Sequence, residues 1–235
     1  MNKENFKKAI ELVKNNSPKR NFKQAYDLII NLKDLNMKKP DQQVNSWATL
    51  RYSKGKKAKV CALVGPELAG NAKENCDTVI LQDDFPKYAE SKIAIKKLAK
   101  THDFFIAQAN IMPDVAKTFG RVLGSRGKMP NPKIGCVVPP NANLKQLVDK
   151  LQKTIGLIAK TQLSIKCLIA TEDMKDEEVL DNIMTIYNNL THTLPAEERN
   201  IKNIQLKFTM GPPATITHKE VTMKPKKAAE EVKKK

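Results

Sequence analysis

The spacing of hydrophobic residues near the N-terminus predicts one helix followed by two strands. Residues 3–14 carry apolar side chains at helical spacing among lysines, which predicts a short amphipathic helix. Residues 26–32 instead alternate apolar with less apolar positions, and a second alternation runs through Ala48, Leu50 and Tyr52 to a turn at 53–56. Because a period of two is typical of strands that bury one face, we expect an antiparallel pair here.

The middle of the chain has a different pattern. Residues 60–64, V-C-A-L-V, are continuously apolar, as in parallel strands that are covered on both faces. Helices and strands then alternate, with helices expected over about 66–76, 88–100, 113–123 and 143–155 and strands over 78–81 and 103–109. This order predicts a Rossmann-like, three-layer α/β domain around a parallel sheet.

Beyond Gly156 the alternating pattern returns. A strand is expected over residues 163–169, a helix with an acidic first turn over 176–190, and a last strand over 204–210 that stops at Gly211-Pro212-Pro213. The terminal segments are each too short to bury a good core alone, so together they predict one discontinuous α+β domain.

The predicted organisation is therefore two hinged domains. Residues 1–53 and 157–222 would form the α+β domain, and residues 57–155 would be an inserted α/β domain. Since the chain crosses twice between them, the connection would permit opening and closing while limiting twist. The last residues, 223–235, predict a basic mobile tail.

One stretch combines glycine, proline and cations. Residues 120–135 read G-R-V-L-G-S-R-G-K-M-P-N-P-K-I-G and contain Arg121, Arg126 and Lys128 but no acid. We interpret the whole stretch as a loop in which glycines let the backbone approach a phosphate and these three cations bind RNA. The other interpretation is a solvated basic turn.

The charge of the chain favours a polyanionic partner. It has 42 Lys and Arg against 25 Asp and Glu, a formal net charge of +17, and ten of these cations with a single acid between Val115 and Thr171. Such segregation points to nucleic acid or an anionic membrane. No apolar run is long enough to span a membrane, and the N-terminus lacks an apolar signal-peptide core, so we expect no membrane partner and a cytoplasmic location.

The residues that could carry catalysis or bind a metal are scattered. The four cysteines and three histidines show no metal-ligand spacing, and no nucleophile lies beside a base, so we expect no cofactor, no metal and no enzyme activity. A nucleotide-dependent enzyme built on the α/β domain is the main alternative, although neither a Walker loop nor a dinucleotide-binding glycine motif is present. A nonspecific basic RNA chaperone is the second alternative.

Four motifs, in this order, resemble the L1 family of large-subunit ribosomal proteins, which belong to the mobile side stalk. They are N-F-K-Q-A-Y-D-L-I-I-N-L-K-D from Asn21, M-K-K-P-D-Q-Q-V from Met37, the glycine-rich stretch above, and T-M-G-P from Thr209. The likeness covers nearly the whole chain and favours an archaeal member. Ser125 and Asn31 depart from the residues that family members commonly have there, Pro and Lys.

The resemblance implies an rRNA-binding protein without catalytic activity, monomeric when free of the ribosome. Its α+β domain would bind the side-stalk region of large-subunit rRNA, it would assist the release of deacylated tRNA from the exit site, and it would repress translation of its own mRNA through the leader. By motif position the RNA-contacting candidates are Phe22, Asp27, Thr209, Met210 and Gly211. For Phe22 and Met210 the competing interpretation is core packing.

Overall fold

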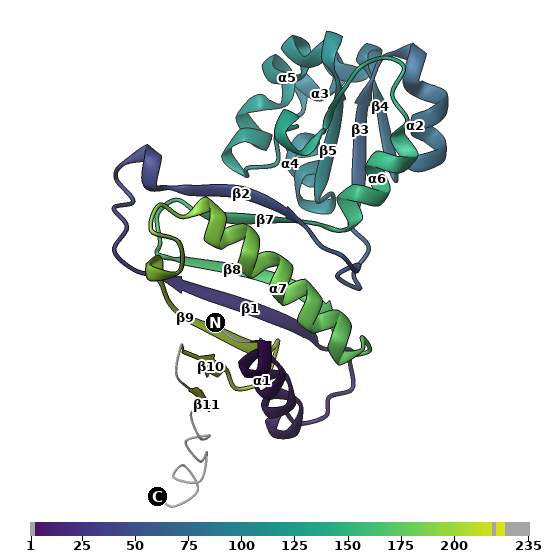
Figure 1. Cartoon of the computed structure of the whole chain (residues 1–235). Coiled ribbons are helices and arrows are strands. Elements are labelled where there is room, and N and C mark those ends of the chain that lie inside the picture. Colours follow the sequence, from purple (N-terminus) through teal and green to yellow (C-terminus); the bar gives the residue numbers. More distant parts are fainter. Residues whose placement is uncertain (1–2, 218–219, 224–235) are drawn as a thin grey trace, which may run out of the picture. The chain divides into compact units, whose positions relative to one another are not determined.

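The computed structural model describes residues 3–217 and 220–223, and they form two compact units (Figure 1). Unit 1 combines Met1–Lys56 with Lys153–Lys235, and unit 2 is Lys57–Gln152. The expected fold class, an α+β domain with an inserted α/β domain, is confirmed by an antiparallel sheet from both chain ends and a parallel sheet between them. Of the expected tail, residues 223–235, only Met223 is described, as the last residue of β11 (Val221–Met223), and residues 224–235 lie outside the described residues.

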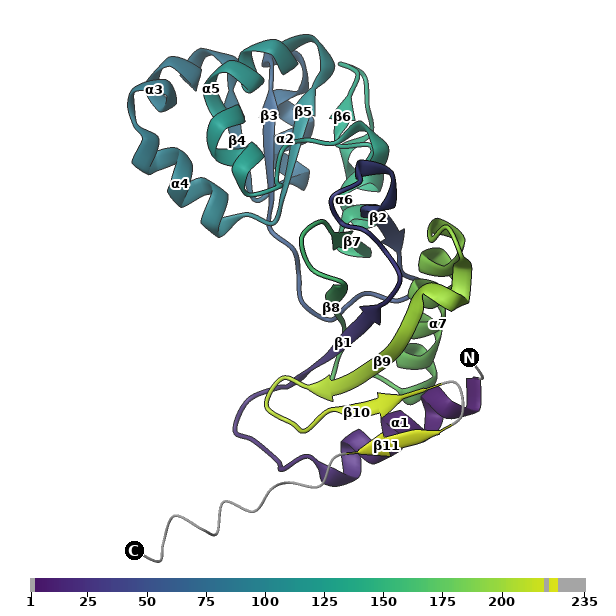
Figure 2. The same cartoon turned by 90° about the vertical axis from the view of Figure 1, so that its left-hand side faces the viewer.

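Unit 1 is built on a five-stranded sheet with the order β11-β10-β9-β1-β8. Its strands are β1 (Ala25–Leu32), β8 (Ser164–Thr171), β9 (Ile201–Phe208), β10 (Ala214–Ile216) and β11 (Val221–Met223). Helices α1 (Lys3–Asn16) and α7 (Asp176–Thr193) lie on the same side of this sheet (Figures 1 and 2). The alternating burial along β1 follows from this arrangement, since every second side chain faces the helices and is buried.

The core of unit 1 fills the space between the sheet and the two helices. Tyr26 and Phe208, which are opposite each other on β1 and β9, have ring centroids 4.4 Å apart, and Phe6 of α1 packs against Tyr187 of α7 at 5.9 Å. At each of these positions the aromatic ring is buried. The other face of the sheet carries the partly exposed residues of β1 and β9.

A separate two-stranded ladder completes unit 1. Strand β2 (Val44–Thr49) pairs antiparallel with β7 (Thr154–Ala159), and Trp47 lies opposite Gly156. A Cβ atom on Gly156 would be 2.9 Å from the Trp47 ring, so glycine is needed for the ring to lie across the neighbouring strand. The sequence pattern placed the end of the second strand near residue 52, three residues late, and did not predict β7.

Unit 2 is a four-stranded parallel sheet with helices on both faces, as expected. The order is β4-β3-β5-β6, formed by β3 (Val60–Val64), β4 (Thr78–Leu81), β5 (Phe104–Gln108) and β6 (Val137–Val138). Figure 1 shows α3 (Phe85–Glu90), α4 (Lys92–Thr101) and α5 (Met112–Ser125) on one face, and α2 (Ala69–Asn75) and α6 (Leu144–Gln152) on the other. All five residues of β3 are buried, which explains the continuous apolar run.

Short 3-10 turns join several of these elements. They are η1 (Pro40–Gln42), η2 (Pro66–Leu68), η3 (Gln82–Asp84), η4 (Ala109–Ile111), η5 (Pro132–Ile134) and η6 (Glu197–Asn200). Those in unit 2 mainly lead out of strands into helices, where the chain must reverse direction quickly.

Two sequence expectations for unit 2 were wrong. The single helix expected over 88–100 is two helices, because Ser91 leaves the helical conformation and its hydroxyl accepts a hydrogen bond from the Ala94 backbone as the N-cap of α4. The loop expected from Gly120 begins later, since residues 120–125 continue α5. The apolar spacing of Val115, Phe119 and Leu123, all buried, sustains the helix through its glycines.

Candidate nucleic-acid interface

The candidate residues of unit 1 meet at one end of the paired strands β1 and β9. Thr209, the residue after β9, extends the ladder because its backbone N–H donates to the Ala25 carbonyl oxygen at 3.0 Å. The Ala25 N–H in turn donates to the Thr209 hydroxyl at 3.3 Å. Thr209 is exposed, so its fixed backbone and hydroxyl stand at the surface where the two strands end.

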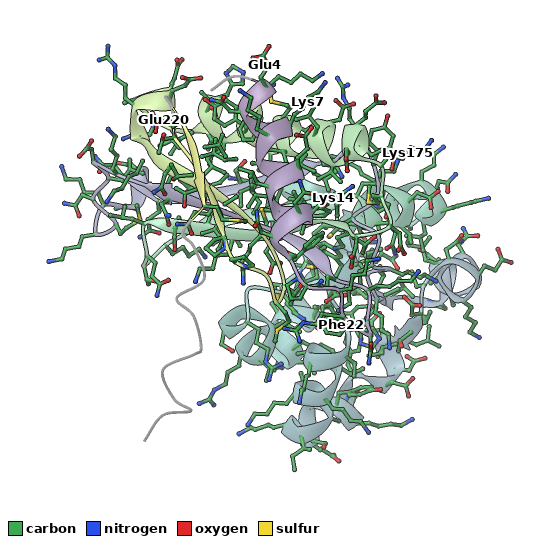
Figure 3. All side chains as sticks on the ribbon, turned by 90° about the horizontal axis from the view of Figure 1, so that it is seen from below. Glu4, Lys7, Lys14, Phe22, Lys175 and Glu220 are labelled. Carbon is green, nitrogen blue, oxygen red and sulfur yellow. The ribbon has the colours of Figure 1, made fainter. Side chains whose placement is uncertain are left out.

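Phe22 and Met210 are exposed apolar side chains that lie just beyond the same two strand ends. Phe22 is 51 % exposed and precedes β1, while Met210 is 58 % exposed and follows β9. Figure 3 labels Phe22 beyond the end of α1 that carries Lys14. Core packing, the competing interpretation, is therefore wrong for both residues. Large side chains held in water beside a strand end are suited to stack on unpaired bases.

Gly211 is required by packing within the chain. Its N–H donates to the Phe208 carbonyl oxygen at 3.0 Å, which closes a tight turn after β9. A Cβ atom at this position would come within 2.5 Å of the Ser17 hydroxyl and 3.2 Å of the Phe208 Cβ. Glycine thus lets the turn lie against the segment that follows α1, and this contact sets the position of Thr209 and Met210.

Asp27 lies on the sheet face that the helices leave open. It is opposite Lys207 on β9, with its carboxylate 4.0 Å from the Lys207 ammonium, and both side chains are about two-thirds covered by their neighbours. Partial burial raises the pKa of the Asp27 carboxyl above its usual value, and the Lys207 ammonium opposes that shift. A carboxylate in this setting can accept hydrogen bonds from ribose hydroxyls while Lys207 attracts the neighbouring phosphate.

Cross-strand register adds residues that sequence analysis missed. Lys207 and Lys166 face the same side as Asp27 and Ile29, since Lys166 is opposite Ile29 on β8. Asn31 lies on this face too, and its amide donates to the Asn203 side chain at 2.7 Å. The alternation in β8 and β9 could have suggested these positions, but only the register brings them together.

The candidates in unit 2 occupy a different setting. Arg121 is exposed on α5, and Arg126, also exposed, is the residue that ends the helix. Lys128 is instead directed inward, because its ammonium donates to the carbonyl oxygens of Ala99 at 3.1 Å and His102 at 2.6 Å. These contacts give Lys128 a structural role at the C-terminus of α4, where carbonyl groups lack helical partners.

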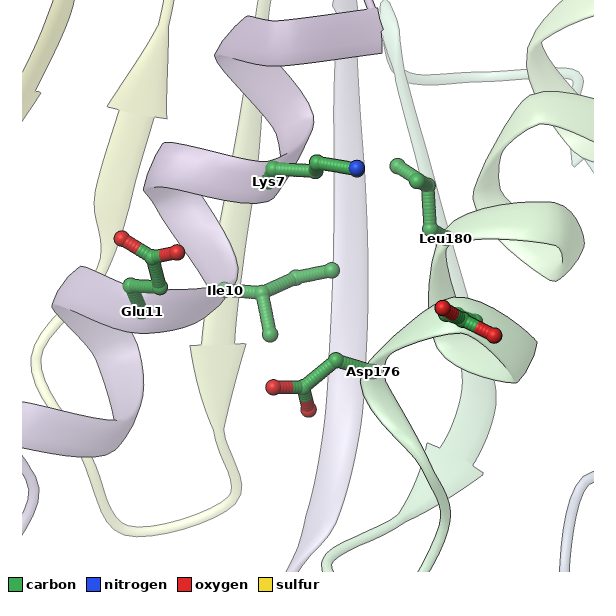
Figure 4. A pocket seen from close by; sticks show the side chains of 6 residues that line it. Lys7, Ile10, Glu11, Asp176 and Leu180 are labelled. Atoms are coloured by element: carbon green, nitrogen blue, oxygen red, sulfur yellow. The ribbon is translucent and has the colours of Figure 1, made fainter.

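A small hollow between α1 and α7 lies on the helical side of the sheet. It is lined by Lys7, Ile10, Glu11, Asp176, Glu177 and Leu180, and Figure 4 shows charged groups around the apolar Ile10 and Leu180. Lys14 forms an ion pair with Asp176 beside it. Ile10 and Leu180 are buried, and through side chains of this kind α1 packs against α7 over the sheet.

The four cysteine thiols are held in their unreactive, protonated form. Burial raises the pKa of Cys61 and Cys167 to about 12 and of Cys76 and Cys136 to about 11, so these thiols stay protonated at neutral pH. Among the described residues no group of His, Cys, Asp and Glu could hold a metal ion. No helix in the described ranges is long and apolar enough to cross a membrane.

Comparison with known proteins decides what kind of molecule this is. Residues 12–212 match the sequence model of the ribosomal protein L1p/L10e family. The chain belongs to this family. The L1-family assignment confirms the resemblance of the four motifs, and as a ribosomal protein the molecule is not an enzyme, so the nucleotide-dependent alternative is set aside.

Relatives of this L1-family protein are archaeal and match over nearly their whole length. Large ribosomal subunit protein uL1 of Methanothermococcus thermolithotrophicus is 41% identical over 216 residues, which cover 92% of this chain and 99% of the relative. The uL1 protein of Methanocaldococcus jannaschii is 34% identical over 95% of this chain and 100% of the relative. That of Nanoarchaeum equitans is 39% identical over 84% of this chain and 93% of the relative.

Proposed function

We propose that this protein is a constituent of the large ribosomal subunit that binds the side-stalk region of large-subunit rRNA through unit 1. The observation that carries the proposal is the pair of exposed apolar side chains, Phe22 and Met210, beside the Thr209 hydroxyl at the common end of β1 and β9. Exposed aromatic and apolar groups next to hydrogen-bonding backbone fit unpaired bases and ribose better than they fit a uniform duplex.

The open sheet face continues this surface. Lys166 and Lys207 supply cations, and Asp27 and the Asn31–Asn203 pair supply polar groups that can contact ribose hydroxyls. In this arrangement the strand end selects the RNA structure, and the lysines add attraction to phosphates that is independent of sequence.

Two further activities belong to the same proposal. We expect the protein to assist the release of deacylated tRNA from the exit site, with Arg121 and Arg126 of unit 2 as cations available to RNA. We also expect it to repress its own mRNA by binding a leader that imitates the side-stalk structure. The free protein would be a monomer in the cytoplasm.

The test compares two double variants of the full chain. Phe22→Ala/Met210→Ala removes the exposed pair at the strand end. Ile158→Ala/Leu163→Ala removes two apolar side chains of unit 1 that are each 40% exposed, and Leu163 lies at the other end of the sheet, before β8. Affinity is measured for a side-stalk fragment of archaeal large-subunit rRNA and for an unrelated RNA duplex of equal length.

The first variant should bind the side-stalk fragment at least roughly tenfold more weakly, because stacking contributes about 1–3 kcal/mol per base. Its affinity for the duplex should be unchanged, and the control variant should match the unmodified protein on both RNAs. Equal affinity of the unmodified protein for the two RNAs would favour the charge-only RNA chaperone instead.

A further inference from the structure

Helices α4 and α5 of unit 2 carry an excess of cations that the helices on its other face lack. Residues 92–133, which include α4 and α5, contain nine Lys or Arg and two Asp. On the other face, η2 with α2 and then α6 contain three Lys and three acids: Lys73, Lys145, Lys150, Glu67, Glu74 and Asp149. Helix α3 and the preceding η3 lie on the same face as α4 and α5 but carry Asp83, Asp84 and Glu90 against Lys87, so the excess of cations belongs to α4 and α5 themselves.

The two acids of this stretch are engaged elsewhere. The Asp103 carboxylate accepts a hydrogen bond from the Lys59 backbone at 3.2 Å, and the Asp114 carboxylate accepts one from the Gln82 amide at the start of α5. In the described part of unit 2, Lys57 pairs with Asp77 and Lys87 with Asp84, and neither ion pair involves a residue of α4. The lysines of α4 are therefore left without an acidic partner.

Three of these lysines form a regular row. Lys92, Lys96 and Lys100 are all exposed and recur every four residues, so they lie along one side of α4 with about 6 Å of helix between successive positions. Lys97 is exposed beside them, and Ile93 next to the row is 80% exposed. Like charges at this spacing repel one another and slightly destabilise the helix, and an anion bound along the row would relieve that repulsion.

The row leads toward the cations of α5. Lys128 donates to the carbonyl oxygens of Ala99 and His102, which places the C-terminal end of α5 next to that of α4. Lys100 therefore lies at the same end of unit 2 as Arg126, which follows α5. A row of ammonium groups that continues into a guanidinium is complementary to the evenly spaced phosphates of one RNA strand.

We propose that the α4 row, Lys92, Lys96 and Lys100, is a second RNA-binding surface that holds a sugar–phosphate backbone without selecting its sequence. This proposal rests on the proposed function, since the RNA would be part of the same complex that unit 1 recognises. The α4 row would increase affinity and its dependence on salt, whereas the strand end of unit 1 would determine which RNA is bound.

The experiment uses two triple variants of the full chain with the same change in charge. Lys92→Gln/Lys96→Gln/Lys100→Gln removes the α4 row and keeps residues of good helix propensity. The control, Lys59→Gln/Lys73→Gln/Lys145→Gln, removes three exposed lysines of unit 2 that lie outside α4 and α5. Affinity for the side-stalk fragment and for an unrelated RNA duplex is measured from 50 to 300 mM salt, after circular dichroism shows each variant folded.

Loss of the α4 row should make log affinity fall less steeply with log salt, by about 2 to 3 in the slope. It should also lower the affinity for both RNAs by roughly tenfold at 0.1 M salt. The control should change the slope by less than about 1. If the two triple variants behave alike while the unmodified protein still prefers the side-stalk fragment, the α4 surface is wrong and the proposed function stands. If the unmodified protein shows no such preference, the proposed function fails first. Binding of each variant to polyglutamate is measured as well. Loss of that binding with unchanged RNA binding would assign the row to an acidic protein and overturn the proposal.

Discussion

The two sheets of this protein bury their strands in different ways. In unit 1 the helices α1 and α7 lie on one face, so β1 alternates between buried and partly exposed residues. In unit 2 helices lie on both faces, and β3 is buried throughout. A sheet with an open face can offer backbone, strand ends and side chains to a partner. A sheet covered on both faces leaves the outer surfaces of its helices and the loops at its strand ends for binding.

The contrast between an open and a covered sheet predicts that a polar substitution in an inner strand of each sheet lowers the free energy of unfolding by different amounts. Ala62→Gln in β3 should reduce the free energy of unfolding of unit 2 by about 3 kcal/mol or more, because it overpacks a fully buried position and buries an unpaired amide. Ile29→Gln in β1 should cost unit 1 less than about 1 kcal/mol, since that side chain faces the open side.

These losses can be measured separately by urea denaturation. The only tryptophan, Trp47, is in β2, so its fluorescence reports the unfolding of unit 1, whereas far-UV circular dichroism reports both units. Equal losses for the two variants would contradict the assignment of an open and a covered sheet.

Alkaline pH should destabilise unit 2 more than unit 1, which is the second largest expected effect. Cys61, Cys76 and Cys136 are in unit 2 and Cys167 is in unit 1, and burial raises the pKa of each thiol from 9.0 to about 11 or 12. Above pH about 9 the thiol ionises in the unfolded chain but stays protonated in the folded protein. The free energy of unfolding therefore falls as the pH rises from about 9 toward 11 or 12, so the stabilisation that is fully present below pH about 9 is lost.

Unit 2 should therefore lose stability faster than unit 1 between pH 8.5 and 10, by up to about 1.4 kcal/mol per pH unit for each additional buried cysteine. The measurement is the urea midpoint at several pH values in reductant. Cys61→Ala/Cys136→Ala should flatten the dependence for unit 2, and an unchanged dependence would show that these thiols are not its cause.

Replacing a glycine of the candidate site in unit 1 should have a smaller, destabilising effect. Gly211→Ala should destabilise unit 1 by about 1 kcal/mol, because the new Cβ atom approaches the Ser17 hydroxyl and the Phe208 Cβ. Ser17→Ala should recover most of that loss when combined with it, which a double-mutant cycle by urea denaturation measures. Strictly additive effects would rule out the contact.

Replacing glycines in helix α5 of unit 2 by alanine should have the smallest effect on stability, and it should stabilise the unit. Gly120 and Gly124 are in α5, with no atom of the described chain within 4 Å of a Cβ placed on either one apart from the helix itself. Gly120→Ala and Gly124→Ala should each stabilise unit 2 by about 0.5–1 kcal/mol in thermal or urea unfolding. Destabilisation by either change would indicate a crowded site or a loop there.

The sequence predicted the fold class because the two ways of burying a strand leave different patterns. It failed where the determining contact is distant or where one local rule opposes another. Strand β7 shows no clean alternation, since Gly156 is set by Trp47 on another segment. At Gly120 the glycine suggested a loop, yet the buried positions of α5 sustain a helix through it.

The candidate site was predicted only in part. Motif resemblance supplied Phe22 and Met210, and the structure shows that both are exposed. Lys166 and Lys207 required the register of β1 with its two neighbours, which no local pattern contains. Lys128 looked like a free cation among glycines, but its ammonium is bound by two carbonyl oxygens at the end of α4.

The place of β1 in its sheet also fixes an order of events during synthesis. Both of its neighbours, β8 and β9, come from the chain after residue 153, whereas unit 2 is one continuous segment that ends at Gln152. Unit 2 can therefore fold while the polypeptide is still being made, but β1 has no partner in its sheet until β8 has been made, and it gains its second neighbour only when Phe208 has emerged. A newly made chain would complete its open sheet face, and with it the proposed RNA-binding surface, only after β9 has been made, long after unit 2.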